Sequence, residues 1–285
     1  MPLEVVTQAG EVCQRAQKHR RDGRKIALVP TMGFLHDGHV SLLHEGRRRA
    51  DVLVLSIFVN PTQFGPNEDL DRYPRDLPGD LDKARAAGVD LVFAPAAAAM
   101  YAPGYQSFVQ VRAAQKGLCG DKRPDHFDGV ASVVTKLFHI TQPDVAIFGQ
   151  KDYQQLVVIQ TMVRDLNFAI EIVGMPIVRE PDGLAMSSRN AYLSPEERRQ
   201  ALVLHQGLVA SEQAVGAGET RAQNLVACVR DVVASAPLAR IEYIEIRDAV
   251  SLAPVDVLTA PVVCALAVFV GKTRLIDNRV LTGLS

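Results

Sequence analysis

Short apolar runs alternate with longer segments of helical spacing over about the first 180 residues, and this alternation constrains the fold most. The run VLVLSIFV at Val52–Val59 is apolar but for one serine. Strands of this composition are covered on both faces, as in a parallel sheet. Strand and helix patterns in alternation are typical of βαβ units. We therefore expect an α/β protein with a Rossmann-like, doubly wound parallel sheet and a smaller C-terminal α+β domain.

The expected elements follow this pattern along the chain. The expected strands of the sheet are Lys25–Pro30, Val52–Asn60, Asp90–Ala94, Val145–Gly149 and Ile172–Val178, and the expected helices are His39–Ala50, Gly79–Ala87, Val130–Ile140 and Tyr153–Leu166. Polar loops are expected at Asn60–Pro78, Lys116–Gly129 and Arg179–Ala191. The sequence pattern then changes. We expect a helix capped by Ser194, a helix over Glu219–Ser235, and strands at Ile241–Ile246, Val262–Val270 and Thr273–Asp277. The expected domains are 1–179 and 180–285.

Composition excludes several classes of protein. The net charge of −1 gives no basic surplus for binding a nucleic acid. The first residues lack the basic start and apolar core of a signal peptide, and no apolar run is long enough to span a membrane. Four scattered cysteines without a CxxC pair are typical of reduced thiols. We expect a cytoplasmic protein with no membrane partner.

The segment PTMGFLHDGH, from Pro30 to His39, follows an expected strand and precedes an expected helix. Ligands bind open α/β sheets at this edge, and a helix N-terminus offers N–H groups to phosphate. Gly33 and Gly38 allow close approach of a ligand, and two imidazoles can donate hydrogen bonds or protons near neutral pH. The alternatives are two exposed loop histidines, or a metal pair, which lacks the spacing of a zincin. We favour phosphate chemistry.

Three further segments leave strand ends or lie near the domain boundary: FVNPTQF with Asn60 and Gln63, FGQKDYQQL with Lys151, and AMSSRN with Arg189. Each has an ordinary alternative, namely turn chemistry, a solvated lysine and a polar linker. For the last two the ordinary alternative is better if each is taken alone. Together the four segments favour one nucleotide site, because a doubly wound sheet brings strand ends to one edge. A dinucleotide fingerprint is absent, and Leu266 stands where a P-loop needs glycine.

In order and spacing, these segments resemble the pantoate–β-alanine ligase (pantothenate synthetase) family of the HIGH-motif nucleotidyltransferase superfamily. HDGH resembles the HIGH box, MSSR resembles the second phosphate loop, and RPDHFDGV and RLIDN complete the match. The resemblance implies ATP-dependent joining of (R)-pantoate to β-alanine through a pantoyl adenylate, with AMP and pyrophosphate released. It also implies Mg²⁺ held mainly by the ATP phosphates, no metal ligands from the protein, and a homodimer through the N-terminal domain.

The resemblance also implies roles for individual residues. Catalytic roles fall to His39, His36, Lys151 and Arg189, with His39 as proton donor. The ATP site would comprise Met32, Gly33, Phe34, Leu35, His36, Asp37, Gly38, His39, Gly149, Gln150, Lys151, Asp152, Val178, Met186, Ser187, Ser188 and Arg189. Pantoate would bind Gln63, Gln155 and Asn60, β-alanine would approach Gln63, and Tyr73 and Arg123 would stand behind them.

Two residues depart from the family pattern. Gln150 stands where the family usually has glutamate, and Cys119 stands where many members have an acid. We interpret Cys119 as structural. Two other functions remain open: a nucleotidyltransferase that keeps a nucleotidyl product, which would not explain FVNPTQF or YQQL, and a non-catalytic nucleotide-binding homologue. Intact His36, His39, Lys151 and Arg189 argue against the second.

Overall fold

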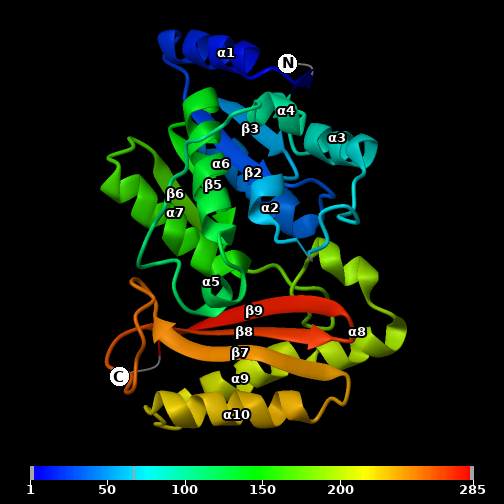
Figure 1. Ribbon diagram of the computed structural model, residues 1–285, viewed down its shortest axis with the longest axis vertical. Coiled ribbons are helices and arrows are strands. Elements are labelled where there is room, and N and C mark those ends of the chain that lie inside the picture. The colour runs from blue at the N-terminus through cyan, green and yellow to red at the C-terminus, as the bar shows by residue number, and fades with distance from the viewer. Residues whose placement is uncertain (1–2, 67, 283–285) are drawn as a thin grey trace. The chain divides into compact units, whose positions relative to one another are not determined.

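The computed structural model describes residues 3–66 and 68–282, which form two compact units (Figure 1). The first unit takes the described residues up to Ala113, then Arg123–Gln150 and Val158–Pro176. The second takes Ala114–Lys122, Lys151–Val157 and the described residues from Ile177 onward.

The first unit is built on a six-stranded sheet in which every pair of neighbours is parallel. Its strand order is β1-β4-β3-β2-β5-β6. The strands are β1 (Glu4–Val6), β2 (Ile26–Thr31), β3 (Val52–Ile57), β4 (Leu91–Phe93), β5 (Val145–Gly149) and β6 (Glu171–Met175). The five strands predicted here are all present. The expected Rossmann-like sheet is confirmed.

Helices cover both faces of this sheet, which explains its uninterrupted apolar strands. Ala27 and Val29 of β2 pack in one cluster with Leu43, from the helix that follows. Their neighbours Ile26 and Leu28 are also buried, although they point to the opposite face, because side chains alternate along a strand. The helices of this unit are α1 (Ala9–Arg21), α2 (Asp37–Arg49), α3 (Leu77–Ala86), α4 (Ala97–Met100) and α6 (His126–Thr141).

The strand order reverses beside β2, and this reversal fixes where a ligand can bind. From β2 the chain moves outward to β3 and β4, whereas β5 and β6 lie on the other side of β2. The segment after Thr31 and the segment after Gly149 therefore leave neighbouring parallel strands at a topological switch point. Open α/β sheets bind ligands in the crevice at such a point.

The second unit carries an antiparallel sheet, β7-β8-β9, made of β7 (Ala239–Asp248), β8 (Val262–Val270) and β9 (Thr273–Leu281). Helices α9 (Val203–Gly216) and α10 (Ala222–Ala234) pack with it in a single apolar cluster that includes Leu208, Val229 and Leu266. Helix α8 (Pro195–Ala201) begins with the predicted cap, because Ser194 and Glu197 form a capping box. This unit confirms the smaller α+β part of the expected fold.

The structure differs from the expected elements at several places. The segment Lys116–Gly129, expected as a loop, contains α5 (Leu118–Lys122) and the first turn of α6. Helices α1 and α9 and strand β1 were not predicted. Helix α7 (Tyr153–Asp165) was predicted within a residue. Within the described residues, no helix is both long and apolar enough to cross a lipid bilayer.

Candidate active site

The histidine pair lies at the start of α2, directly after the turn that leaves β2. Gly33 and Phe34 both adopt positive φ, +83° and +51°, and so reverse the chain there. His36 precedes the helix, Asp37 and Gly38 open its first turn, and His39 is its third residue. The two imidazole rings lie 4.0 Å apart between centroids. The structure thus brings both predicted histidines to a helix N-terminus, where free N–H groups favour an anion.

A backbone contact sets which nitrogen of His39 carries its proton. The His36 N–H donates to Nδ1 of His39, at 3.3 Å. Because Nδ1 accepts a hydrogen bond, it cannot carry the proton of a neutral imidazole, so that proton sits on Nε2. Nε2 is therefore the atom of His39 that can donate to a ligand oxygen.

The turn before the histidines is clamped by two side chains of α3 that the sequence analysis did not identify. The buried carboxylate of Asp80 accepts from the N–H groups of Phe34, at 2.8 Å, and Leu35, at 2.6 Å. Lys83 donates to the Leu35 carbonyl at 2.6 Å. A Cβ on Gly33 would lie 2.9 Å from an Asp80 oxygen, so only glycine fits. Burial raises the pKa of Asp80, and its backbone hydrogen bonds only partly offset this.

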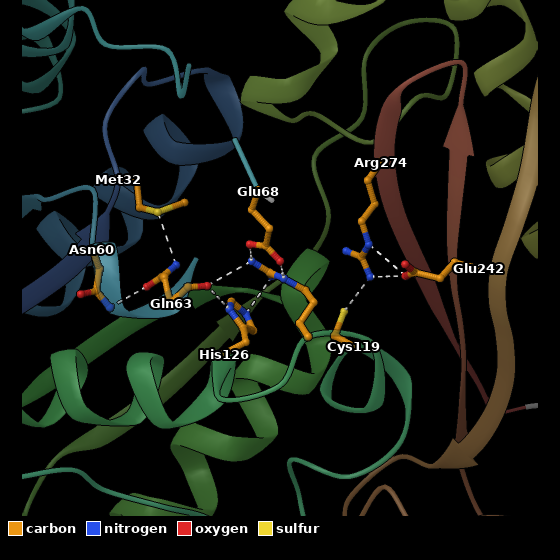
Figure 2. Close-up of polar contacts among 9 residues, drawn as sticks. Met32, Asn60, Gln63, Glu68, Cys119, His126, Glu242 and Arg274 are labelled. Atoms are coloured by element: carbon orange, nitrogen blue, oxygen red, sulfur yellow. Dashed lines mark hydrogen bonds and ion pairs between the residues drawn. The ribbon is translucent and has the colours of Figure 1, made fainter. Parts of the chain in front are cut away.

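Asn60 and Gln63, two predicted substrate residues, are joined by their side chains just after β3. Asn60 Nδ2 donates to Gln63 Oε1 at 3.1 Å, and Gln63 Nε2 donates to the Met32 sulfur at 3.4 Å (Figure 2). Gln63 ends the short 3₁₀ turn η1 (Pro61–Gln63). The predicted residues Met32, Asn60 and Gln63 therefore form one cluster.

Two side chains also hold the backbone carbonyl of Gln63: Arg123, and His126 at the start of α6. His126 Nδ1 donates to this carbonyl at 2.7 Å (Figure 2). Arg123 donates to the same carbonyl at 3.2 Å. Arg123 also forms a bidentate pair with Glu68, at 2.5 and 2.7 Å. Burial alone would raise the pKa of Glu68, but the hydrogen bonds and charge of Arg123 outweigh it and lower that pKa. The long loop after β3 is thereby tied to α6.

In the second unit, Lys151 and Asp152 lie in a short 3₁₀ turn, η2 (Gln150–Asp152). The Lys151 ammonium lies 3.1 Å from the Asp152 carboxylate, and the Lys151 side chain is about one-fifth exposed. Asn278 of β9 donates to the Lys151 carbonyl at 2.9 Å and so fixes the backbone of this turn. Within the first unit, Gly149 ends β5, and Gln150 follows it.

The two glutamines of YQQL have different environments. Gln154 is buried: its amide oxygen accepts from Cys119 N, and its nitrogen donates to the carbonyls of Ala114, Lys116 and Gly117. It therefore holds the segment before α5. Gln155, the residue predicted to bind pantoate, is half-buried. The distinction could not be made from sequence, because both residues are glutamine.

The MSSR segment closes a compact loop in the second unit. Met186 N donates to the Val178 carbonyl at 3.0 Å, and Ser187 accepts from Arg189 N at 3.3 Å to cap η3 (Ser188–Tyr192). Asn190, which was not predicted, holds the loop through Glu180 and the Ala185 carbonyl. Five predicted residues thus share one loop: Val178, Met186, Ser187, Ser188 and Arg189. Ser188 is buried, whereas Arg189 is half-buried.

The contacts of Cys119, where the sequence departs from the family pattern, are those of a structural residue. Its buried thiol lies 3.2 Å from the Tyr243 hydroxyl. The thiol also lies 3.5 Å from Arg274, which is paired with Glu242 (Figure 2). Burial raises the pKa of Tyr243 well above its ordinary value. The four cysteines, all among the described residues, are free thiols.

Comparison with known proteins places this geometry in a family. The family model described as pantoate-beta-alanine ligase matches residues 4–280. The chain belongs to the pantoate–β-alanine ligase family. Curated pantothenate synthetases of Trichlorobacter lovleyi and Myxococcus xanthus are both 56% identical to it, over 98% and 93% of this chain and 99% and 91% of theirs.

Solved structures of the family have the same fold. The pantothenate synthetase of Thermus thermophilus matches with a TM-score of 0.92 at 42% identity, over 97% of this chain and 98% of that one. The pantoate-beta-alanine ligase of Francisella tularensis, complexed with beta-gamma ATP and beta-alanine, matches with a TM-score of 0.81 at 31% identity, over 98% and 97%. The resemblance inferred from sequence is confirmed, and this chain is an enzyme of the ligase family.

Proposed function

We propose that this chain joins (R)-pantoate to β-alanine in two steps, using ATP. The pantoate carboxylate attacks the α-phosphate and forms pantoyl adenylate and pyrophosphate. The β-alanine amine then attacks the acyl carbon, and AMP leaves as pantothenate forms. The observation that carries the proposal is the histidine pair at the N-terminus of α2, at the topological switch point of the sheet.

His39 and the helix start would serve the first step. Charge accumulates on the phosphate oxygens as the carboxylate attacks, and fixed donors stabilise it most when they are already oriented. His39 Nε2 carries the proton that can be donated, because Nδ1 accepts from His36 N–H. His36, the turn Met32–Leu35, Asp37 and Gly38 would complete this part of the ATP site.

Phosphate and substrate contacts would come from the remaining predicted residues. Lys151, Ser187, Ser188 and Arg189 supply positive charge and hydroxyl donors that suit phosphate oxygens. Gln63, Asn60 and Gln155 would bind pantoate, with Gln63 also approaching β-alanine. Gly149, Gln150, Asp152, Met186 and the backbone of Val178 would line the nucleotide.

Magnesium would be held through ATP and water. Within the described residues, no group of three or more His, Cys, Asp or Glu side chains is placed to hold a metal ion. Mg²⁺ keeps several of its waters and binds mainly through substrate phosphates. When bound, the ion would neutralise charge on the phosphates.

The setting of the enzyme is part of the same proposal. Free cysteines suit a cytoplasmic protein. The family resemblance supports a homodimer through the N-terminal part of the chain. From the change in sequence pattern we also propose functional domains at 1–179 and 180–285, with the phosphate loop in the second. We propose small-molecule substrates and neither nucleic-acid nor membrane partners.

The test measures pyrophosphate and AMP release with ATP, Mg²⁺ and pantoate, with and without β-alanine. We expect steady AMP formation only with both substrates. Pyrophosphate release without pantoate would indicate another acceptor, as for a nucleotidyltransferase. No release under any condition would favour a non-catalytic homologue.

A further inference from the structure

A chain of hydrogen bonds that begins at Tyr101 orients the amides of Asn60 and Gln63. Tyr101 follows α4, and its hydroxyl donates to Asn60 Oδ1 at 2.7 Å. The Thr62 hydroxyl donates to the same oxygen at 3.0 Å. Tyr101 lies outside every motif that carries the resemblance to the family.

The orientation of the Asn60 amide follows from a third contact. Its other end lies 3.2 Å from the backbone carbonyl of Gly129, in α6. A carbonyl oxygen only accepts hydrogen bonds, so the Asn60 atom that faces it must be the NH₂ group. The amide oxygen of Asn60 therefore faces the two hydroxyls, which is consistent with their roles as donors.

The orientation of the Asn60 amide determines the orientation of the Gln63 amide. The Asn60 NH₂ group also reaches Gln63, at 3.1 Å, so the Gln63 atom on that side must be the amide oxygen. The Gln63 NH₂ group then points the other way, and among the described residues its acceptor is the thioether of Met32. A thioether is a weak acceptor, and an amide nitrogen has two hydrogens. Gln63 therefore keeps strong donor capacity for a ligand.

We propose that Tyr101 is a positioning residue that fixes Gln63 as a hydrogen-bond donor toward a substrate oxygen. The inference rests on the proposed function, in which Gln63 binds pantoate. With the opposite orientation, Gln63 would present its amide oxygen to a carboxylate oxygen, and two acceptors would face each other. The chain from Tyr101 thus selects a substrate that offers acceptor oxygens at this point.

The surroundings of Tyr101 keep its hydroxyl in place as a donor. Its ring packs edge-on against Tyr105, with centroids 5.0 Å apart, and the Lys136 ammonium lies over both rings. Burial raises the pKa of Tyr101, so the phenol stays protonated through the neutral range. Tyr105 shares this packing, but among the described residues its hydroxyl has no hydrogen-bond partner. It therefore provides a matched control.

The experiment compares Tyr101→Phe with Tyr105→Phe in the full-length enzyme. Tyr101→Phe is expected to raise KM for pantoate about 3- to 10-fold, the value of one neutral hydrogen bond, with KM for ATP and the melting temperature unchanged. Tyr105→Phe should behave as wild type. Equal pantoate KM values in the two variants would overturn the proposal. If Tyr101→Phe lowers the melting temperature, Thr62→Val, which removes the second donor, provides the same comparison.

A double-mutant cycle with Gln63→Ala separates positioning from a general loss of structure. If Tyr101 acts through Gln63, adding Tyr101→Phe to Gln63→Ala leaves the pantoate KM unchanged. Additive effects would contradict the proposal. Failure of the proposed function is distinguishable, because wild-type enzyme would then release no AMP with pantoate and β-alanine, whereas failure of the inference leaves wild-type turnover intact.

Discussion

At the scale of single residues, the proton on His39 is set by the backbone of its partner histidine. Nδ1 accepts from His36 N–H, which leaves the proton on Nε2. We predict that His39→Ala lowers the rate of adenylate formation about 10²- to 10⁴-fold, as expected for a lost proton donor. The measurement is single-turnover pyrophosphate release. The control is His44→Ala, because His44 is an exposed residue of the same helix; an equal loss in both variants would exclude a specific role for His39.

Asp80 acts on the same turn through two backbone hydrogen bonds. In Asp80→Asn, the single amide oxygen can accept from one of the two N–H groups. The amide NH₂ group is itself a donor, so it cannot accept from the other N–H group. We predict that KM for ATP rises about tenfold, in line with a lost buried hydrogen bond. Asp82→Asn is the control, because that carboxylate lies on the same helix and is 79% exposed. An unchanged KM for ATP in Asp80→Asn would refute the clamp.

The clamp also predicts a pH dependence. Burial raises the pKa of Asp80, so it takes up its proton at a higher pH than an exposed aspartate does. The ionised form accepts two N–H groups, whereas the protonated form presents a hydroxyl hydrogen to one of them. Both hydrogen bonds from the turn to Asp80 are therefore present above the pKa of Asp80, and one is lost as pH falls through that pKa. KM for ATP should rise on the acid side in wild type but not in Asp80→Asn.

Residue-scale prediction from sequence was possible where a motif carried the information. HDGH, FVNPTQF and MSSR located the histidines, Gln63 and the serine–arginine loop. Asp80 and Tyr101 could not be predicted in this way, because each acts through a partner more than 40 residues away. A single aspartate within a helix, or a single tyrosine just after one, has no local pattern that indicates such a contact.

At the scale of elements, the loop after β3 depends on the Arg123–Glu68 pair. The pKa of Glu68 is lowered below its ordinary value of 4.5 in the folded state. A lowered carboxyl pKa contributes stability that is present above 4.5 and lost as pH falls through the folded pKa. We predict that Glu68→Gln lowers the free energy of unfolding near pH 7. The difference from wild type should shrink below pH 4.5; a constant difference with pH would contradict this assignment.

Close packing of α6 against η1 requires a glycine. A Cβ on Gly129 would overlap the Thr62 carbonyl and the Gln63 nitrogen, both of which are backbone groups. We predict that Gly129→Ala costs about 1–3 kcal/mol of stability through overpacking and raises KM for pantoate by displacing Gln63. Gly10→Ala, at an exposed position of α1 with no atom within 4 Å of the new Cβ, is the control. Equal melting temperatures and KM values would refute the close contact.

Element prediction was most accurate for strands buried on both faces. Their apolar runs placed β2, β3 and β5 within a few residues. Strand β1 was missed because it has three residues, of which only Val6 is buried. Glycine, proline and polar residues made Lys116–Gly129 resemble a loop, although the five-residue α5 and the start of α6 lie within it. Asp125, with φ of +63°, ends the break between these two helices.

At the scale of the whole molecule, the fold class and family followed from pattern and motif together. The alternating pattern predicted a parallel sheet, and the order of its strands places two of the motifs at the topological switch point. The strand order itself could not be derived from the pattern, because periodicity indicates strands but not their neighbours. The family resemblance supplied the reaction that the site alone leaves open.

In the proposed reaction, the pantoate carboxylate attacks the α-phosphate of ATP. The test is a single turnover with pantoate that carries ¹⁸O at both carboxylate oxygens, in the presence of ATP, Mg²⁺ and β-alanine, followed by mass spectrometry of the products. We predict that AMP carries one ¹⁸O atom, because the attack of the β-alanine amine on the acyl carbon of pantoyl adenylate leaves one carboxylate oxygen on phosphorus. Label in inorganic phosphate with ADP as product, or AMP without label, would contradict it.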